Sequence, residues 1–115
     1  MTTIYHNPRC GKSRDTLALL KEKGIDPQVV LYLETPPSAA QIKTLLQQLG
    51  LTDARALMRK GEAEYKDLNL ADANLSQDAL IEAMAQHPKL IERPIVVKDG
   101  KAALGRPPEN VLAIL

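Results

Sequence analysis

The chain has 115 residues, enough for one domain that buries roughly two-thirds of the surface its unfolded form exposes. Fifteen Lys and Arg against fourteen Asp and Glu leave a formal net charge of +1, so no global field favours nucleic acid or an anionic membrane. A single cysteine excludes an internal disulfide, and there is neither a charged-then-apolar leader nor a long apolar run. We therefore expect a cytoplasmic monomer that contacts neither nucleic acid nor membrane and holds no metal.

The first third of the chain predicts a strand, a helix and a second strand. Residues 3–6 (TIYH) form a β-prone run that stops at an Asn-Pro dipeptide, which is typical of a turn. Apolar residues among charged ones over residues 12–23, followed by Gly24, predict a helix, and Cys10 lies just before its first turn. Residues 28–33 (QVVLYL) are a continuous apolar run, as expected of a strand buried on both faces. This order implies a parallel, right-handed unit.

The middle of the chain predicts helices. A capping-box pattern begins a helix at Ser38, and Gly50 closes it. A short helix is expected over about residues 52–58, and a longer one, with apolar residues on one stripe, over about residues 76–86. We interpret this block as a helical insertion of about residues 38–90.

The last part predicts two antiparallel strands and a closing helix. Residues 94–104 (PIVVKDGKAAL) contain Asp99-Gly100, a strong signal for a two-residue hairpin turn. Residues 106–115 (RPPENVLAIL) open with prolines suited to a helix start. The element order predicts an α/β fold with a thioredoxin-like, mixed four-stranded sheet that carries helices on both faces, in a single domain over residues 1–115.

Cys10 is the candidate reactive residue, because its neighbours are polar or charged. A loop that leads from a strand into a helix surrounds its occupant with backbone N–H groups and the positive end of the helix dipole, which favours an anion. Such surroundings lower the pKa of a thiol from about 8.5 to between about 3.5 and 7.5. We predict that Cys10 is a thiolate nucleophile, stabilised by Ser13 and Arg14 and supported by His6. The alternative is a small buried residue without chemistry.

Three motifs compete for this loop. A Walker phosphate loop would need a glycine where His6 stands, and a tyrosine-phosphatase loop would need an arginine where Thr16 stands. The surviving motif is Cys-x-x-Ser over residues 10–13, at the start of a thioredoxin-type helix. This placement is typical of a single-thiol redox site.

Three arginines are candidates for binding an anion: Arg59, Arg93 and Arg106. A solvated side chain is the default for any one of them. However, Arg93 and Arg106 each precede a proline at an end of the predicted hairpin, which should pass beside the cysteine loop in a thioredoxin-like sheet. Guanidinium groups match tetrahedral oxyanions bidentately. In such folds the corresponding turn usually has a cis bond, so we also expect one at Arg93–Pro94.

Five segments, taken in order, resemble the glutaredoxin-coupled arsenate reductase family: YHNPRCGKSR, VVLYLETPPS, ALMRKGE, HPKLIERPIVV and GRPPENVLAIL. The resemblance runs from about Thr3 to Leu115. It implies a thioredoxin-like fold with a helical insertion and a role in arsenical resistance. It also implies that Cys10 is the nucleophile, that Arg59, Arg93 and Arg106 bind the oxyanion, and that His6, Ser13 and Arg14 support the thiolate.

The resemblance further implies a mechanism without a bound cofactor. Cys10 would attack arsenate, glutathione would join the adduct as a co-substrate, and glutaredoxin would remove the glutathione, reducing As(V) to As(III). Reduction takes two electrons and the chain has one cysteine, so external thiols must supply them. Relatives that use an internal cysteine cascade are thereby excluded.

The residues alone also allow other functions, because one fold serves several functions. One is a glutathione-dependent thiol reductase or deglutathionylase that uses the same Cys10. Another is a non-catalytic, redox-sensing regulator that docks on RNA polymerase or another protein. A single-thiol glutaredoxin with an iron–sulfur cluster is disfavoured by Lys12. Ser13 in place of a second cysteine, together with the complete arginine set, favours the reductase.

Overall fold

The computed structural model describes all residues 1–115 and divides them into two compact units. The first comprises Met1–Thr35 and Arg93–Leu115, and the second comprises Pro36–Glu92. The second unit contains the helices of the expected insertion. None of the helices has the length and apolar character needed to cross a membrane.

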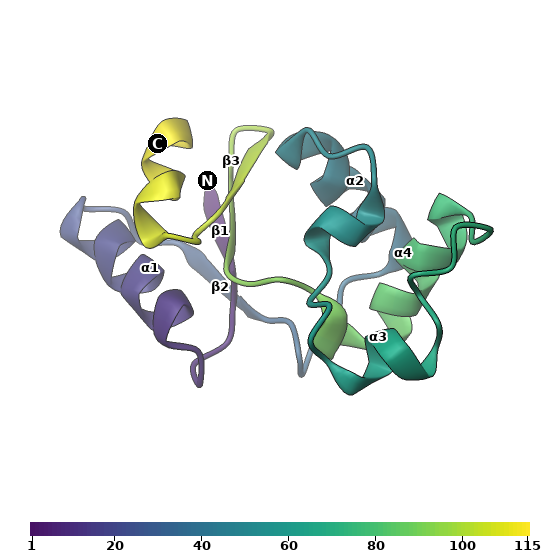
Figure 1. The fold of residues 1–115 in the computed structure, drawn as a ribbon. Coiled ribbons are helices and arrows are strands. Elements are labelled where there is room, and N and C mark those ends of the chain that lie inside the picture. Colours follow the sequence, from purple (N-terminus) through teal and green to yellow (C-terminus); the bar gives the residue numbers. More distant parts are fainter. The chain divides into compact units, whose positions relative to one another are not determined.

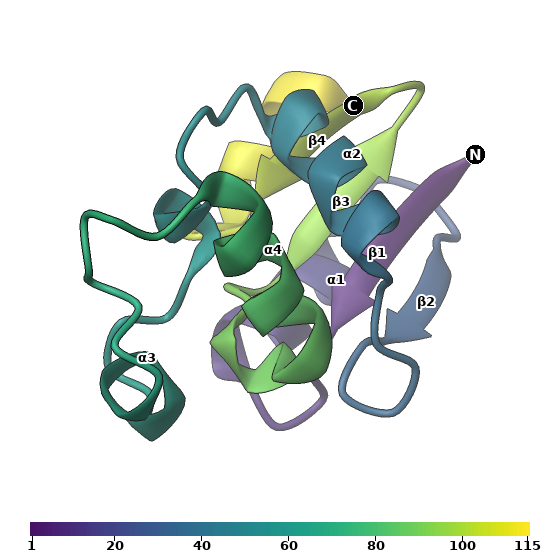
Figure 2. The same cartoon turned by 90° about the vertical axis from the view of Figure 1, so that its right-hand side faces the viewer.

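The first unit is built on a mixed four-stranded sheet, which confirms the predicted fold class (Figure 2). Its strands are β1 (Thr2–His6), β2 (Gln28–Leu31), β3 (Ile95–Lys98) and β4 (Lys101–Leu104). They lie in the order β2-β1-β3-β4, with β1 parallel to β2 and the other neighbours antiparallel. The carboxyl end of β1 therefore lies beside that of β2, and both lead into loops at the same edge of the sheet.

Two helices pack on one face of this sheet, α1 (Gly11–Glu22) and the 3-10 helix η3 (Pro108–Ile114) (Figure 1). Ile4 and Val96 are paired across β1 and β3, so their side chains share a face. They form a core with Leu20 and Val111, and all four side chains are fully buried. Burying an aliphatic side chain of this size stabilises the fold by about 1.5 to 3 kcal/mol, so this core fixes α1 on the sheet.

The second strand differs from its prediction. It ends at Leu31 rather than at residue 33, and Val29 is 44% exposed. The expectation of burial on both faces was wrong: β2 is an edge strand of the sheet, and none of its four residues is fully buried. Beyond it the chain turns, with the N–H groups of Glu34 and Thr35 donating to the carbonyl of Leu31.

Two predicted turns are confirmed in the second half of the first unit. Asp99 and Gly100 have φ angles of 51° and 79°, as a two-residue hairpin with positive φ at both central positions requires. The Arg93–Pro94 bond is cis, as expected, and so is the Arg106–Pro107 bond, which was not predicted.

The regular elements of the second unit are all helices, apart from an isolated bridge between Met58 and Ile91. It contains α2 (Ala39–Leu49), η1 (Ala54–Leu57), α3 (Ala63–Asp67), α4 (Gln77–Gln86) and η2 (Pro88–Leu90). The capping box is present, with the N–H of Gln41 donating to the Ser38 hydroxyl and the N–H of Ser38 donating to the Gln41 side chain. The sequence did not predict α3 or η2, because α3 has five residues and buries none of them and η2 is a single short turn.

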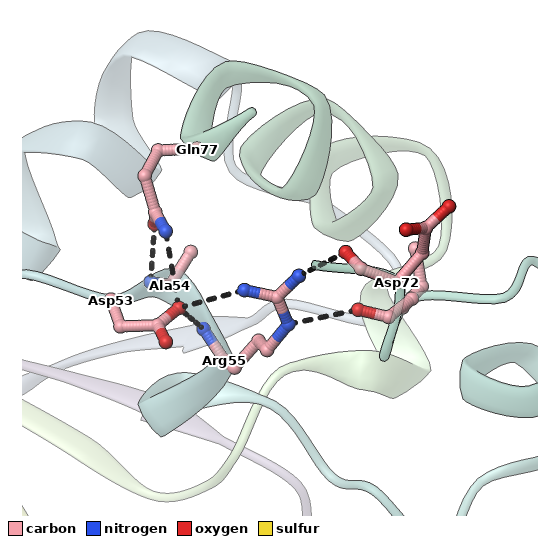
Figure 3. A network of polar contacts seen from close by, with 6 residues as sticks. Asp53, Ala54, Arg55, Asp72 and Gln77 are labelled. Carbon is pink, nitrogen blue, oxygen red and sulfur yellow. Dashed lines mark hydrogen bonds and ion pairs between the residues drawn. The ribbon is translucent and has the colours of Figure 1, made fainter. Parts of the chain in front are cut away.

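Arg55 holds the start of η1 to the segment before α4 (Figure 3). Its Nε donates to the carbonyl of Leu70 at 2.9 Å and its Nη2 donates to the carbonyl of Asp72 at 2.7 Å. Its Nη1 lies 3.5 Å from Asp53 Oδ1, which also accepts from the Gln77 amide. The guanidinium of Arg55 is thus used in holding the second unit together.

We expect Arg55→Ala to lower the free energy of unfolding by about 2 to 4 kcal/mol, because it leaves two partly buried carbonyls without their donors. Urea unfolding followed by circular dichroism measures the change. Lys43→Ala, which removes an exposed cation from α2, is the matched control and should unfold like the parent. Equal midpoints for the two variants would mean that the network contributes nothing to stability.

Candidate active site

Cys10 stands at the N-cap of α1, at the end of a tight turn. Its N–H donates to the carbonyl of Asn7 at 3.0 Å, and its own carbonyl accepts the first helical bond, from the N–H of Arg14, at 3.0 Å. The side chain of Asn7 accepts from the N–H of Arg9 and stabilises the same turn. The thiol therefore lies where the free N–H groups of the first helical turn concentrate positive potential, as predicted.

The buried side chain of Ser13 stabilises this turn. Its side chain is fully buried, and its Oγ accepts from the N–H of Asn7 at 3.0 Å and lies 2.6 Å from Nδ1 of His6. The hydroxyl is therefore occupied by the loop. It is the backbone N–H of Ser13, and not its hydroxyl, that bonds the thiol of Cys10.

The surroundings lower the pKa of the Cys10 thiol below its ordinary value. Burial by itself raises this pKa. It is outweighed by the hydrogen bond from the N–H of Ser13, by the hydrogen bond and charge of the Arg93 guanidinium, and by the N–H of Lys12. A lowered pKa increases the thiolate fraction at neutral pH, and the thiolate is the nucleophilic form.

His6 lies beside Ser13 at the end of β1, and its pKa is lowered. Burial lowers its pKa, and the positive charges of Arg14 and Lys21 lower it further. A neutral imidazole can form the hydrogen bond with Ser13 Oγ, and it carries no positive charge that would stabilise the thiolate. His6 therefore contacts the cysteine turn through Ser13.

Arg93 is the cation that reaches Cys10, and Arg106 lies beside it. Nη1 of Arg106 donates to the carbonyl of Arg93 at 3.3 Å, so one arginine holds the backbone of the other. Nε of Arg93 is buried and has no hydrogen-bond partner. A buried guanidinium N–H that is left unpaired is costly, and an oxyanion is a suitable acceptor for it.

Two further residues were predicted for the site, Arg14 and Arg59. Nη1 of Arg14 donates to the carbonyl of Pro8 at 3.0 Å, and this exposed hydrogen bond stabilises the cysteine turn. Arg59 belongs to the second unit, where its Nε lies 3.3 Å from Glu62 and its Nη1 lies 3.7 Å from Glu92. Its N–H donates to the carbonyl of Leu90. No group of three or more His, Cys, Asp or Glu residues is arranged to hold a metal ion.

Three residues that the sequence did not single out complete the site: Asn7, Thr16 and Gly105. Asn7 makes the turn described above, and its Asn-Pro dipeptide indicated only that a turn was present. Thr16 is fully buried and donates to the carbonyl of Lys12. Gly105 packs against Thr16 and Pro94 and donates its N–H to the carbonyl of Pro94. It therefore joins the first turns of α1 to the segment that carries Arg93.

We expect Gly105→Ala to destabilise the fold by about 1 to 3 kcal/mol, as overpacking does. A Cβ at this position would clash with Oγ1 of Thr16 and would lie 2.8 Å from Cγ of Pro94. Gly61→Ala is the control, since a Cβ there meets nothing within 4 Å. Thermal unfolding of both variants measures the effect, and an unchanged Tm for Gly105→Ala would show that this contact relaxes at no cost.

Several known proteins share this fold and much of this sequence. The model of the ArsC family matches residues 5–114. The uncharacterized protein YfgD of Escherichia coli strain K12 is 64% identical over 97% of this chain and 94% of its own length. An arsenate reductase of Neisseria meningitidis serogroup B is 54% identical over 97% of this chain and 96% of its own length. The solved arsenate reductase from Vibrio cholerae superposes with a TM-score of 0.98, at 64% identity over 99% of this chain and 97% of that one. The chain belongs to the ArsC family.

Proposed function

We propose that this protein is an arsenate reductase in which the Cys10 thiolate attacks arsenic and external thiols supply the electrons. The observation that carries the proposal is the pairing of a thiol of lowered pKa with the guanidinium of Arg93, whose buried Nε has no acceptor. A tetrahedral oxyanion bound to Arg93 would satisfy that N–H and would lie against the nucleophile. The relatives named arsenate reductase support the same substrate.

The proposed reaction balances in four steps. The Cys10 thiolate forms an S–As bond with arsenate, and an oxygen leaves as water after protonation. The thiol of glutathione replaces a second oxygen, which also leaves as water. The thiolate of glutaredoxin attacks the glutathione sulfur, which forms a mixed disulfide and leaves two electrons on arsenic. Water then hydrolyses the Cys10–As(III) bond, which releases arsenite and the free thiol.

Arg93 and the N–H groups of Ser13 and Lys12 serve the first step in two ways. They hold the thiolate before reaction, and the guanidinium offsets the repulsion between that thiolate and the incoming oxyanion. A thiolate and a dianion would otherwise repel each other at bonding distance.

A coupled assay tests the proposal. Purified protein, arsenate, glutathione, glutaredoxin and glutathione reductase with NADPH are mixed, and both NADPH loss and arsenite formation are followed. We expect arsenate-dependent NADPH loss that matches arsenite formation mole for mole. Omitting glutathione or glutaredoxin should stop turnover. Rapid reduction of a glutathione mixed disulfide in the absence of arsenate turnover would favour the deglutathionylase alternative instead.

The resemblance also assigns an oxyanion-binding role to Arg59, and we expect Arg59→Ala to raise the KM for arsenate at least tenfold. Glu62→Gln is the matched variant, because it removes a carboxylate from Arg59 while the cation stays. If Arg59 binds arsenate, Glu62→Gln leaves the KM near the parent value or lowers it. If Arg59 is only structural, both variants lose stability and neither raises the KM.

A further inference from the structure

A pocket of about 320 Å³ lies at the edge of the sheet where β1 and β2 end. One wall is formed by residues 6–9, and the other by Leu31, Leu33 and Glu34. The carboxyl ends of parallel strands are the usual place for ligands in open α/β sheets. The volume is at the small end of ligand sites, which suits a small molecule such as a tripeptide.

This pocket adjoins the nucleophile. Its first wall is the turn that the N–H of Cys10 closes by donating to the carbonyl of Asn7. The Cα atoms at the two ends of such a turn lie within about 7 Å of each other. A ligand in the pocket therefore lies against the turn whose last residue is Cys10.

The chemistry of the walls does not suit arsenate. Pro8, Leu31 and Leu33 are apolar, and the Leu33 side chain is 41% exposed. Arg9 and Glu34 bring one positive and one negative charge, and both side chains are exposed. The carboxylate of Glu34 would repel an oxyanion, and the apolar wall would leave its oxygens without donors.

The walls do suit a flexible peptide that carries charges of both signs. Glutathione has carboxylates for Arg9, an α-ammonium group for Glu34, and methylene groups for the apolar wall. It is also the first external thiol in the proposed reaction. Holding it beside Cys10 turns its attack on the arsenic adduct into an effectively intramolecular step.

We infer that this pocket, between the Cys10 turn and the end of β2, is the glutathione subsite, with Arg9 binding a carboxylate and Glu34 binding the α-ammonium group. The inference rests on the proposed function for the identity of the thiol. In the reaction, the thiol of the bound glutathione replaces an oxygen on arsenic, and that oxygen leaves as water.

Binding of S-methylglutathione, whose thiol is blocked, tests the subsite without arsenate chemistry. In a titration followed by ¹⁵N–¹H spectra, we expect the shifted amides to lie in residues 6–10 and 31–35. Arg9→Ala and Glu34→Gln should each weaken binding at least fivefold. The controls Lys101→Ala and Glu22→Gln remove one charge of each sign from exposed positions outside the pocket and should bind like the parent.

A second ligand tests the assignment of Glu34. An S-methylglutathione analogue that lacks the α-amino group should bind the parent and Glu34→Gln equally. It should still bind Arg9→Ala less tightly than the parent. Equal binding of S-methylglutathione to the parent and to both pocket variants, or shifts confined to other residues, would overturn the inference.

Kinetics separate this inference from the proposed function. Both pocket variants should raise the KM for glutathione and leave the KM for arsenate unchanged. A protein that binds S-methylglutathione in the pocket but does not reduce arsenate would refute the proposed function and keep the subsite. An active reductase whose pocket variants change only the KM for glutaredoxin would refute the subsite and show that this surface docks the protein partner.

Discussion

Replacing Cys10 by serine is expected to lower arsenate reduction by at least roughly 10³-fold, because a serine hydroxyl is not ionised at this site and the S–As bond cannot form. The change keeps the size and hydrogen-bonding shape of the side chain, so the fold should stay intact. Arsenite formation in the coupled assay measures the loss, and thermal unfolding checks the fold.

The variant also separates the possible roles of this residue. Arg93 remains in Cys10→Ser, so arsenate binding measured by calorimetry should persist within a few fold. A deglutathionylase would lose its activity as well, whereas a docking regulator would keep its partner. Cys10→Ser protein that still reduces arsenate at more than a few per cent of the parent rate would exclude Cys10 as the nucleophile.

Arg93→Ala is expected to lower kcat/KM for arsenate roughly 30- to 5,000-fold, which corresponds to a rise of about 2 to 5 kcal/mol in the activation free energy. Two losses combine. The variant removes the guanidinium that helps to lower the pKa of the Cys10 thiol, and it removes the unpaired N–H that we assign to the oxyanion. The effect should therefore depend on pH.

The sign of that dependence follows from the direction of the shift. In the parent, the lowered pKa keeps thiolate populated down to pH values below the ordinary thiol range near 8.5. In Arg93→Ala, the acid limb of the kcat/KM profile should move to higher pH. Arg93→Lys keeps the charge and loses the planar fork, so it should restore part of the pH profile but not the KM. Lys101→Ala, on the same hairpin, is the control, and a loss in Lys101→Ala equal to that in Arg93→Ala would refute the assignment.

The pattern of the sequence predicted most of the fold because its local signals were strong. Ser38 with Gln41, and Asp99 with Gly100, are turn and cap chemistries whose geometry follows from the residues themselves. The edge position of β2 was not predictable in this way. An edge strand with apolar residues has the same composition as a central one, and only the order of strands in the sheet distinguishes them.

The candidate site was predictable in position but not in the action of each group. The location of Cys10 before a helix followed from the strand, turn and helix signals. That the N–H of Ser13 bonds the Cys10 thiol, that the Ser13 hydroxyl bonds His6, and that the pKa of His6 is lowered depend on burial and on contacts between residues seven positions apart. Gly105 gave no signal at all, because its role is a close approach to Thr16 from a distant part of the chain.

The rate at which iodoacetamide alkylates Cys10, measured from pH 5 to pH 10 with and without arsenate, tests the central claim most directly. It reports the thiolate fraction and the occupancy of the oxyanion site in one experiment. We predict an inflection below the usual thiol value of about 8.5 and a slower reaction when arsenate is bound. An inflection at or above about 8.5, together with a rate that arsenate does not change, would contradict the account.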